Sequence, residues 1–395
     1  MYLTKEQEQM LAGEQGEVLE RMFRLLARLG DIYGADRMIS VGSVQVAGVS
    51  YKSIGDPGLE FLEDMAGKGA KVRVPTTLNP PGMDLVDWKE LGFPEDFAEK
   101  QLQIMDAFKK MSIMMTATCT PYLVGNLPRF GEHIAWSESS AVSFANSVIG
   151  ARTNREGGPS ALAAALCGVT PNYGLHLDGN RKPSVVVKVS AELKDNSDFG
   201  ALGYHVGKLV KKGIPYFKGI EHADVDQLKA LGAAMAASGA VALYHAEGLT
   251  PEADIMNTEG LETIDVGERE LRGTYKALNT GKDPDIVILG CPHASLKEIA
   301  TLACKLEGKH LRKPLWICTS RVTKEAATRM GFTEIIEKAG GKVVADTCTV
   351  VSPIERMGYK TTGVNSGKAA NYLPGFCKQQ VVFKSLDDLL EGRSA

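Results

Sequence analysis

Apolar positions along the chain alternate between helical spacing and short unbroken runs. Thr4 and Gln7 have the spacing of a helix capping box, so a first helix is expected to begin there. Apolar residues between positions 18 and 29 then recur on one helical face, and Gly30 is expected to end that run. The pattern therefore predicts that the chain opens with helices.

Beyond these helices, strand-like and helix-like stretches follow one another in a repeated order. Strand, helix, strand, helix and strand are expected at 38–46, 59–66, 71–74, 96–110 and 112–117. The same order is expected at 184–189, 200–211, 214–217, 224–237 and 240–244, and again at 285–289, 296–306, 314–317, 323–338 and 342–345. Alternation of this kind is typical of parallel sheets, because parallel strands need a crossover connection.

The predicted fold class is therefore α/β, with three βαβαβ units whose parallel sheets pack around a central cleft. The units are expected at residues 1–150, which include the N-terminal helices, at 151–255 and at 256–395. One doubly wound sheet with insertions is a second interpretation of the same order. In either case ligands are expected beyond the carboxyl ends of the strands.

The charge balance excludes several kinds of partner. Lys and Arg number 45, Asp and Glu number 48, and the net charge of −3 gives no basic field for nucleic acid or anionic membrane. No run of about 18 uncharged apolar residues occurs, and the N-terminal stretch lacks the pattern of a signal peptide. We expect a cytoplasmic protein, in which seven cysteines are not expected to form a disulfide framework.

Three of the seven cysteines follow predicted strands. Cys119, Cys291 and Cys348 each lie in a strand-to-loop segment, where a thiolate can face a cleft. Their separations of 172 and 57 residues match no zinc-finger or ferredoxin spacing, so spacing alone leaves a core role and a ligand role open. The other four are expected to behave as small buried hydrophobes: Cys167, Cys304, Cys318 and Cys377.

Short polar segments near predicted strand ends have the composition of a pocket for anions and hydroxyls. Such residues occur in four segments, which contain Gly48, Val49 and Ser50; Asn79 and Pro80; Glu138, Ser139, Arg152 and Arg155; and Lys368. Each segment alone is equally typical of a turn or a cap. For Arg152 and Arg155, substrate contact, subunit contact and an internal ion pair are all open. Phosphate-loop and serine-esterase motifs are incomplete or missing.

Five segments of the chain together resemble the aconitase X family. The segments are ATCTPYL, WSESSAVSFANSVIGARTNREGG, LGCPHAS, ADTCTVVSP and NSGKAANYLPG, and the likeness covers nearly the whole chain. The resemblance implies three α/β units around a [4Fe-4S] cluster held by Cys119, Cys291 and Cys348. Three thiolates leave one iron open as a Lewis acid for a substrate hydroxyl and carboxylate. The resemblance also implies a substrate pocket made by Gly48, Val49, Ser50, Asn79, Pro80, Glu138, Ser139 and Lys368.

The resemblance further implies a hydro-lyase that dehydrates (R)-5-phosphomevalonate to trans-anhydromevalonate 5-phosphate in isoprenoid biosynthesis. Related enzymes have a swivelling domain with the catalytic base, and the stretch after Gly375 is too short for it. A separate small subunit is therefore expected, and no catalytic base is assigned to this chain. Dehydration of cis-3-hydroxy-L-proline is an alternative, although Lys368 favours a phosphorylated acid. A non-catalytic iron–sulfur sensor or scaffold is an alternative of another class.

Overall fold

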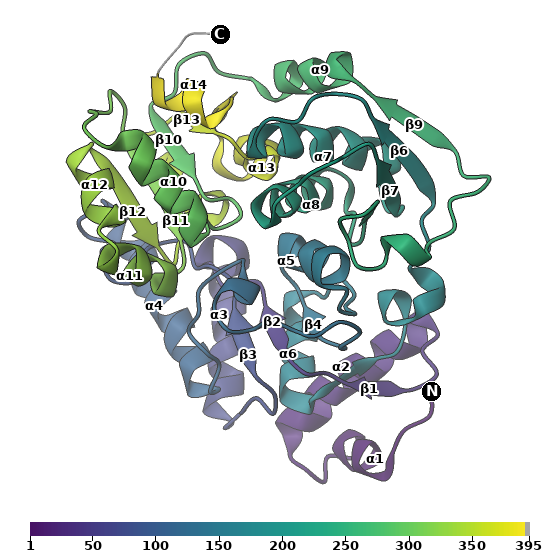
Figure 1. Ribbon diagram of the computed structural model, residues 1–395. Helices are drawn as coiled ribbons and strands as arrows, with labels where there is room; N and C mark the ends of the chain where they lie inside the picture. The colour runs from purple at the N-terminus through teal and green to yellow at the C-terminus, as the bar shows by residue number, and fades with distance from the viewer. Residues whose placement is uncertain (392–395) are drawn as a thin grey trace.

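A computed structural model describes residues 1–391 and contains three α/β units (Figure 1). Each unit has its own parallel sheet with helices packed against it. In the view of Figure 1 the first unit lies below, the second at upper right and the third at upper left. The strands form separate sheets rather than one doubly wound sheet, so the predicted α/β class with several parallel sheets is confirmed.

The first unit is built on a small parallel sheet of order β3-β2-β4, beside an antiparallel pair of β1 and β5. Its strands are β1 (Met38–Ser40), β2 (Val44–Val46), β3 (Thr76–Leu78), β4 (Ala135–Trp136) and β5 (Val169–Pro171). Its helices are α1 (Lys5–Leu11), α2 (Glu17–Tyr33), α3 (Tyr51–Gly67), α4 (Glu95–Lys110), α5 (Ser139–Phe144) and α6 (Gly158–Cys167). The packing of α6 on α2 and β2 favours a unit boundary after β5, and the boundary between residues 150 and 151 stays a prediction.

The second unit carries the parallel sheet β8-β7-β6-β9. Its elements are β6 (Val185–Val189), α7 (Asn196–Val210), β7 (Pro215–Lys218), α8 (Val225–Gly239), β8 (His245–Ala246), β9 (Thr263–Val266) and α9 (Glu268–Leu278). α7 and α8 pack closely against each other, and α8 also contacts α5 of the first unit. The second unit is thereby joined to the first through helices.

The third unit carries the parallel sheet β12-β11-β10-β13-β14. Its strands are β10 (Ile286–Leu289), β11 (Leu315–Thr319), β12 (Gly341–Ala345), β13 (Thr361–Val364) and β14 (Gln380–Phe383). Its helices are α10 (Leu296–Leu306), α11 (Arg321–Arg329), α12 (Phe332–Lys338), α13 (Gly367–Cys377) and α14 (Leu386–Glu391). α13 packs on α8 and α7 of the second unit, and it therefore lies where the second and third units meet (Figure 1).

Two expectations near the N-terminus are wrong. α2 continues through Gly30 and ends at Gly34, which caps the helix in a left-handed conformation with φ of 68°. A Cβ on Gly30 would lie 2.8 Å from Met1 Sδ, so close packing accounts for this glycine. The single strand expected at 38–46 is divided into β1 and β2, which belong to different sheets.

Other predicted strands also differ from the structure. Residues 71–74 bond to the end of α4 and to α6, because Val72 N donates to Met111 O and Arg73 N to Ala165 O. Residues 112–117 meet β3 through a single bridge. The stretch 240–244 is not a strand either. The helix expected at 323–338 is divided at Gly331, where φ is 80°.

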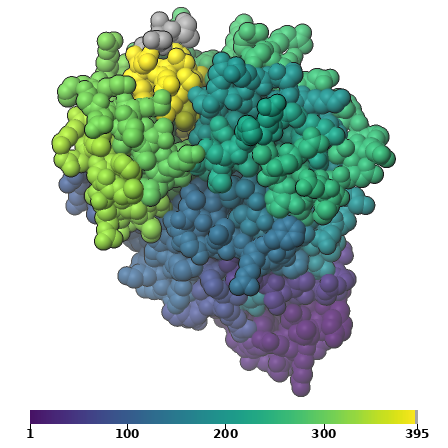
Figure 2. All heavy atoms as spheres, viewed as in Figure 1, coloured from purple at the N-terminus to yellow at the C-terminus, as the bar shows by residue number. Residues whose placement is uncertain are grey.

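The largest apolar core spans the second and third units. It also takes in Met83, Phe93 and Phe97 from the first unit, so the loop after β3 is packed into this core. The first unit has a second core around β2, α2 and α6. The space-filling view shows the three units in contact along their borders (Figure 2). Within residues 1–391, no helix has both the length and the apolar character needed to cross a membrane.

Candidate functional site

Three loops that carry cysteines meet where the first and third units join, a place called the junction below. One loop comes from the first unit and two come from the third. Cys119 precedes the short turn Pro121–Leu123, Cys291 lies just beyond β10, and Cys348 lies just beyond β12. The thiols of Cys291 and Cys348 share a hydrogen bond, and all three thiols interact with the charge of Lys368. The structure therefore brings together the three cysteines that the sequence singled out.

The three thiols differ in their acidity. The hydrogen bond with Cys348, together with burial, raises the pKa of Cys291, and the same bond lowers the pKa of Cys348. Burial raises the pKa of Cys119 to about 12, although the charge of Lys368 acts in the opposite direction. Cys119 and Cys291 are buried and Cys348 is partly exposed, so Cys348 is the most accessible of the three.

A buried ion pair lies beside these thiols. Lys368 Nζ, on the first turn of α13, donates to Glu138 Oε1 and to Ser140 Oγ at 3.1 Å. Asn79 Nδ2 donates to Glu138 Oε2 at 2.7 Å, and Ser139 Oγ donates to Glu138 Oε1 at 3.3 Å. Four predicted pocket residues therefore belong to one polar cluster. Ser140 was not predicted, although its position two residues after Glu138 at the start of α5 was the available signal.

Both members of the ion pair are charged at neutral pH. Burial acts to raise the pKa of Glu138, but Lys368 and the hydrogen bond from Asn79 lower it to about 2. Burial acts to lower the pKa of Lys368, but Glu138 and the three thiols hold it well above its usual range. The junction therefore contains a permanent positive charge next to three thiols.

The loop 48–50 offers backbone donors. It connects β2 to α3, and Gly48 adopts φ of 78°. Within residues 1–391, none of the N–H groups of Gly48, Val49 and Ser50 donates to an acceptor of the protein. The Ser50 hydroxyl donates to Val351 O at 2.7 Å and accepts from Lys52 N, so it is already engaged. The free N–H groups, rather than the hydroxyl, are available for an anion. Pro80, the last predicted pocket residue, is buried next to Asn79.

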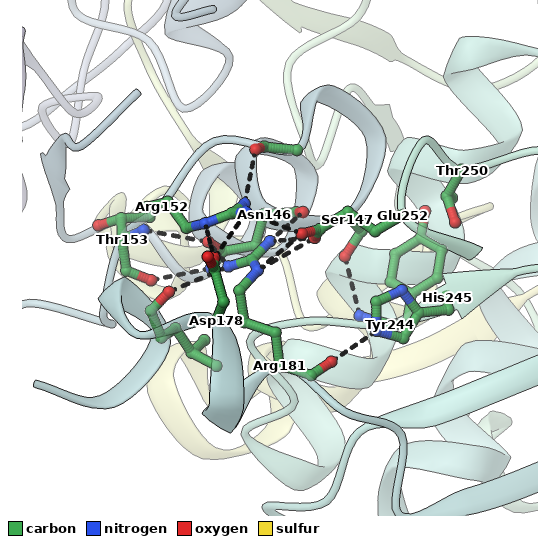
Figure 3. A network of polar contacts seen from close by, with 12 residues as sticks. Asn146, Ser147, Arg152, Thr153, Asp178, Arg181, Tyr244, His245, Thr250 and Glu252 are labelled. Atoms are coloured by element: carbon green, nitrogen blue, oxygen red, sulfur yellow. Dashed lines mark hydrogen bonds and ion pairs between the residues drawn. The ribbon is translucent and has the colours of Figure 1, made fainter. Parts of the chain in front are cut away.

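Arg152 and Arg155 make internal contacts. Figure 3 shows Arg152 in a network in which its Nε lies 3.0 Å from Asp178 Oδ1 and its Nη2 lies 3.0 Å from Glu252 Oε1. Glu252 also pairs with the buried Arg181 at 2.5 Å. Arg155 donates to a backbone carbonyl of α8 at 3.2 Å. For Arg152 the structure supports the internal ion pair, whereas the exposed Arg155 makes one hydrogen bond to the backbone and its three interpretations stay open.

Several buried oxygen atoms near the cysteines have no hydrogen-bond partner among residues 1–391. They are Asn79 Oδ1, Tyr122 Oη, three residues after Cys119, and Thr347 Oγ1, next to Cys348. A buried polar atom without a partner is costly, so such atoms are typical of places where a bound group completes the hydrogen bonding. Three thiols, a lysine and these oxygens are a donor set that fits an iron–sulfur cluster with a polar substrate.

The remaining cysteines mostly follow expectation. Cys167, Cys318 and Cys377 are buried, whereas Cys304 is exposed on α10 because it lies on the outer face of that helix. Within residues 1–391, no group of three or more His, Cys, Asp or Glu side chains is arranged around a single metal ion. In an iron–sulfur cluster each thiolate binds a different iron, so that arrangement is not required.

The chain matches the three domains of aconitase X in order along its length. The first domain is matched by residues 1–179, the second by 183–276 and the third by 284–394. The protein is thus a three-domain α/β protein, and it belongs to the aconitase X family. Its fold is also that of the solved aconitase X of Thermococcus kodakaraensis, described as a holo-form, with a TM-score of 0.94, 51% identity and 99% of both chains covered.

Two named relatives are similar over nearly their full length, and a third over part of its length. The phosphomevalonate dehydratase large subunit of Methanocaldococcus jannaschii is 58% identical, with 100% of both chains covered. That of Methanothermobacter thermautotrophicus is 53% identical, with 99% and 98% covered. The cis-3-hydroxy-L-proline dehydratase of Pseudomonas aeruginosa is 36% identical, and the match covers 97% of this chain and 68% of that enzyme.

Proposed function

We propose that this chain is the large subunit of an iron–sulfur hydro-lyase that dehydrates (R)-5-phosphomevalonate to trans-anhydromevalonate 5-phosphate. The observation that carries the proposal is the identity of 52–58% to four archaeal phosphomevalonate dehydratase large subunits over at least 95% of this chain. The two cis-3-hydroxy-L-proline dehydratases are more distant, at 34–36%. All these relatives are named as dehydratases, which speaks against a sensor or scaffold.

Cys119, Cys291 and Cys348 are the proposed ligands of a [4Fe-4S] cluster. The proposal is supported by three thiols on separate loops at one junction, and by the buried charge of Lys368, which offsets the negative charge of thiolates. When bound by three thiolates, such a cluster supplies one open iron as a Lewis acid for the hydroxyl that leaves.

The chain's own residues bind and orient the substrate in this proposal. The free N–H groups of residues 48–50 donate to an anionic oxygen, and Lys368 supplies a fixed positive charge for a second anionic group. Asn79 Oδ1 has no partner in the described part of the chain and can accept from a substrate hydroxyl, while Asn79 Nδ2 donates to Glu138. Glu138 and Ser139 therefore orient Asn79 and Lys368, and Pro80 shapes the loop that presents them.

A separate small subunit is proposed to provide the swivelling domain and the base. The support is the name "large subunit" carried by the full-length relatives, together with the greater length of the proline enzymes. In the reaction the base takes the proton from the carbon next to the carboxylate, the electron pair of that C–H bond forms the C=C bond, and the C–O bond breaks. The hydroxyl leaves with the C–O electron pair, and the proton that the base took completes the released water. The chain alone is therefore expected to bind substrate but to turn it over poorly.

The deciding experiment measures iron, acid-labile sulfide and turnover in anaerobically prepared protein. We expect about four of each per unaltered chain, loss of both in Cys348→Ala, and retention in the control Cys304→Ala, since Cys304 is exposed and away from the junction. Turnover of (R)-5-phosphomevalonate is expected once the small subunit is added. Absence of iron from the unaltered protein would exclude the cluster. Full turnover by the chain alone would exclude a base on a separate subunit. Turnover of cis-3-hydroxy-L-proline, with none of (R)-5-phosphomevalonate, would exclude the proposed substrate.

A further inference from the structure

His293 lies between the three cysteine loops and is completely buried. It follows Cys291 by two residues, and its solvent exposure is 0%. Its ring Nε2 lies 2.7 Å from the carbonyl oxygen of Thr347, and its ring Nδ1 lies 3.0 Å from Thr118 Oγ1. Thr118 directly precedes Cys119, and Thr347 directly precedes Cys348. One imidazole therefore connects all three loops.

The hydrogen-bond directions follow from the partners. A carbonyl oxygen only accepts, so Nε2 carries the proton and donates to Thr347. In the neutral ring Nδ1 then accepts from the Thr118 hydroxyl, whose oxygen in turn accepts from the backbone N–H of Thr120 at 3.2 Å. Both ring nitrogens therefore make a hydrogen bond, and each partner, Thr118 or Thr347, is the residue directly before a cysteine.

The backbone of His293 is fixed as firmly as its ring. Its N–H donates to Cys119 Sγ at 3.1 Å, a direct contact with one of the three thiols. Its carbonyl accepts from the buried Lys229 at 3.3 Å. The next residue, Ala294, is held on both sides, because its N–H donates to Cys318 O and its carbonyl accepts from Thr319. The backbone contacts therefore fix the point from which the side chain extends, and the imidazole cannot turn away without breaking both of its ring contacts.

We infer that His293 is a positioning residue that holds the three thiols at a fixed mutual spacing. This inference rests on the proposed cluster. Three loops from two units must present their thiols together, and fixing them in advance reduces the conformational entropy lost when the cluster binds. Loss of the imidazole contacts therefore weakens retention of the cluster, apart from any effect on the substrate.

The test compares variants that remove one contact or both. His293→Leu removes both ring contacts, whereas His293→Gln retains a donor near the position of Nε2 and loses the contact to Thr118. Thr118→Val removes that same contact from the other side with little change in volume, and Thr118→Ser restores it. The readout is the rate at which the full chain loses its cluster absorbance to an iron chelator without oxygen, in the absence of substrate.

We expect His293→Leu to lose the cluster about tenfold to a hundredfold faster than the unaltered chain. His293→Gln and Thr118→Val are expected to match each other at a smaller increase, and Thr118→Ser to behave as the unaltered chain. The control is His245→Leu, because His245 is also buried and its Nε2 also lies 2.8 Å from a backbone carbonyl, that of Arg181 (Figure 3). The His245→Leu variant should retain the cluster even if its melting temperature falls.

Each outcome separates this inference from the proposed function. If the unaltered chain binds no cluster, the proposed function itself fails. If the unaltered chain binds a cluster and both His293→Leu and Thr118→Val retain it equally well, His293 has no positioning role. If His293→Leu does not fold, Thr118→Val and Thr118→Ser decide the question. An equal loss in His245→Leu would mean that general destabilisation causes the effect, which would also overturn the inference.

Discussion

Lys368 and Glu138 form a buried ion pair although 230 residues separate them in the sequence. Their side chains are 7% and 12% exposed, so neither charge is solvated when its partner is removed. Glu138 directly precedes α5 in the first unit and Lys368 lies in the first turn of α13 in the third. The pair therefore connects two units beside the cysteines. The pair orients the proposed substrate pocket and also contributes to the way in which the units dock.

Removal of the lysine charge should destabilise the chain. In Lys368→Met, Glu138 stays buried without its cation, and we expect a loss of about 3–5 kcal/mol in the free energy of unfolding. Urea unfolding of the chain without its cluster measures this loss. In the double variant Lys368→Met with Glu138→Gln the loss should be smaller than the sum of the two single losses. Additive losses would show that the two charges do not interact.

The stability should depend on pH through Glu138. Its pKa falls from 4.5 to about 2 on folding, so the carboxylate stabilises the folded chain above pH 4.5, and this contribution is lost as the pH falls toward 2. A shift of this size corresponds to about 3 kcal/mol. Urea unfolding between about pH 6 and pH 3 should show a steeper loss in the unaltered chain than in Glu138→Gln. Parallel curves for the two proteins would contradict the assignment.

Gly82 lies where the proposed pocket has no room for a side chain. A Cβ at this position would lie 2.5 Å from Phe97 Cζ and 2.7 Å from both Ser50 Oγ and Val351 O. Gly82→Ala is therefore expected to displace the loop that carries Asn79. We expect a higher KM for substrate in the complete enzyme, by about tenfold for a loss of 1.4 kcal/mol in binding. The control is Gly273→Ala on α9, where a Cβ meets nothing within 4 Å and KM should not change.

The arginine network should respond unequally to its two acids. Glu252 is buried and pairs with both Arg181 and Arg152. Glu252→Leu removes the carboxylate of the buried Arg181 and leaves Arg152 with the exposed Asp178, so it should cost about 3–5 kcal/mol of stability. Asp178 contacts the same Arg152, but its side chain is 86% exposed, so Asp178→Asn should change stability by about 1 kcal/mol or less. Urea unfolding of both variants tests this contrast, and equal losses would contradict it.

The accuracy of the sequence-based predictions depended on the length of each element. Helix 296–306 was predicted with the bounds that the structure has, because eleven residues with a capping box carry a strong periodic signal. The strands of the first unit have two or three residues each, too few for a pattern to distinguish them from neighbouring extended segments. The wrong strands at 71–74 and 112–117 follow from this.

The sequence by itself determined the α/β class, the alternation of strands and helices, and the presence of three cysteines after apolar strands. Those features depend on local spacing, which a reader of the chain can measure. Only the tertiary structure decided that the thiols meet, that Lys368 pairs with Glu138, and that His293 connects three loops. Such contacts join residues that are distant along the chain, and they exist only because the packing of three units brings the loops to one junction.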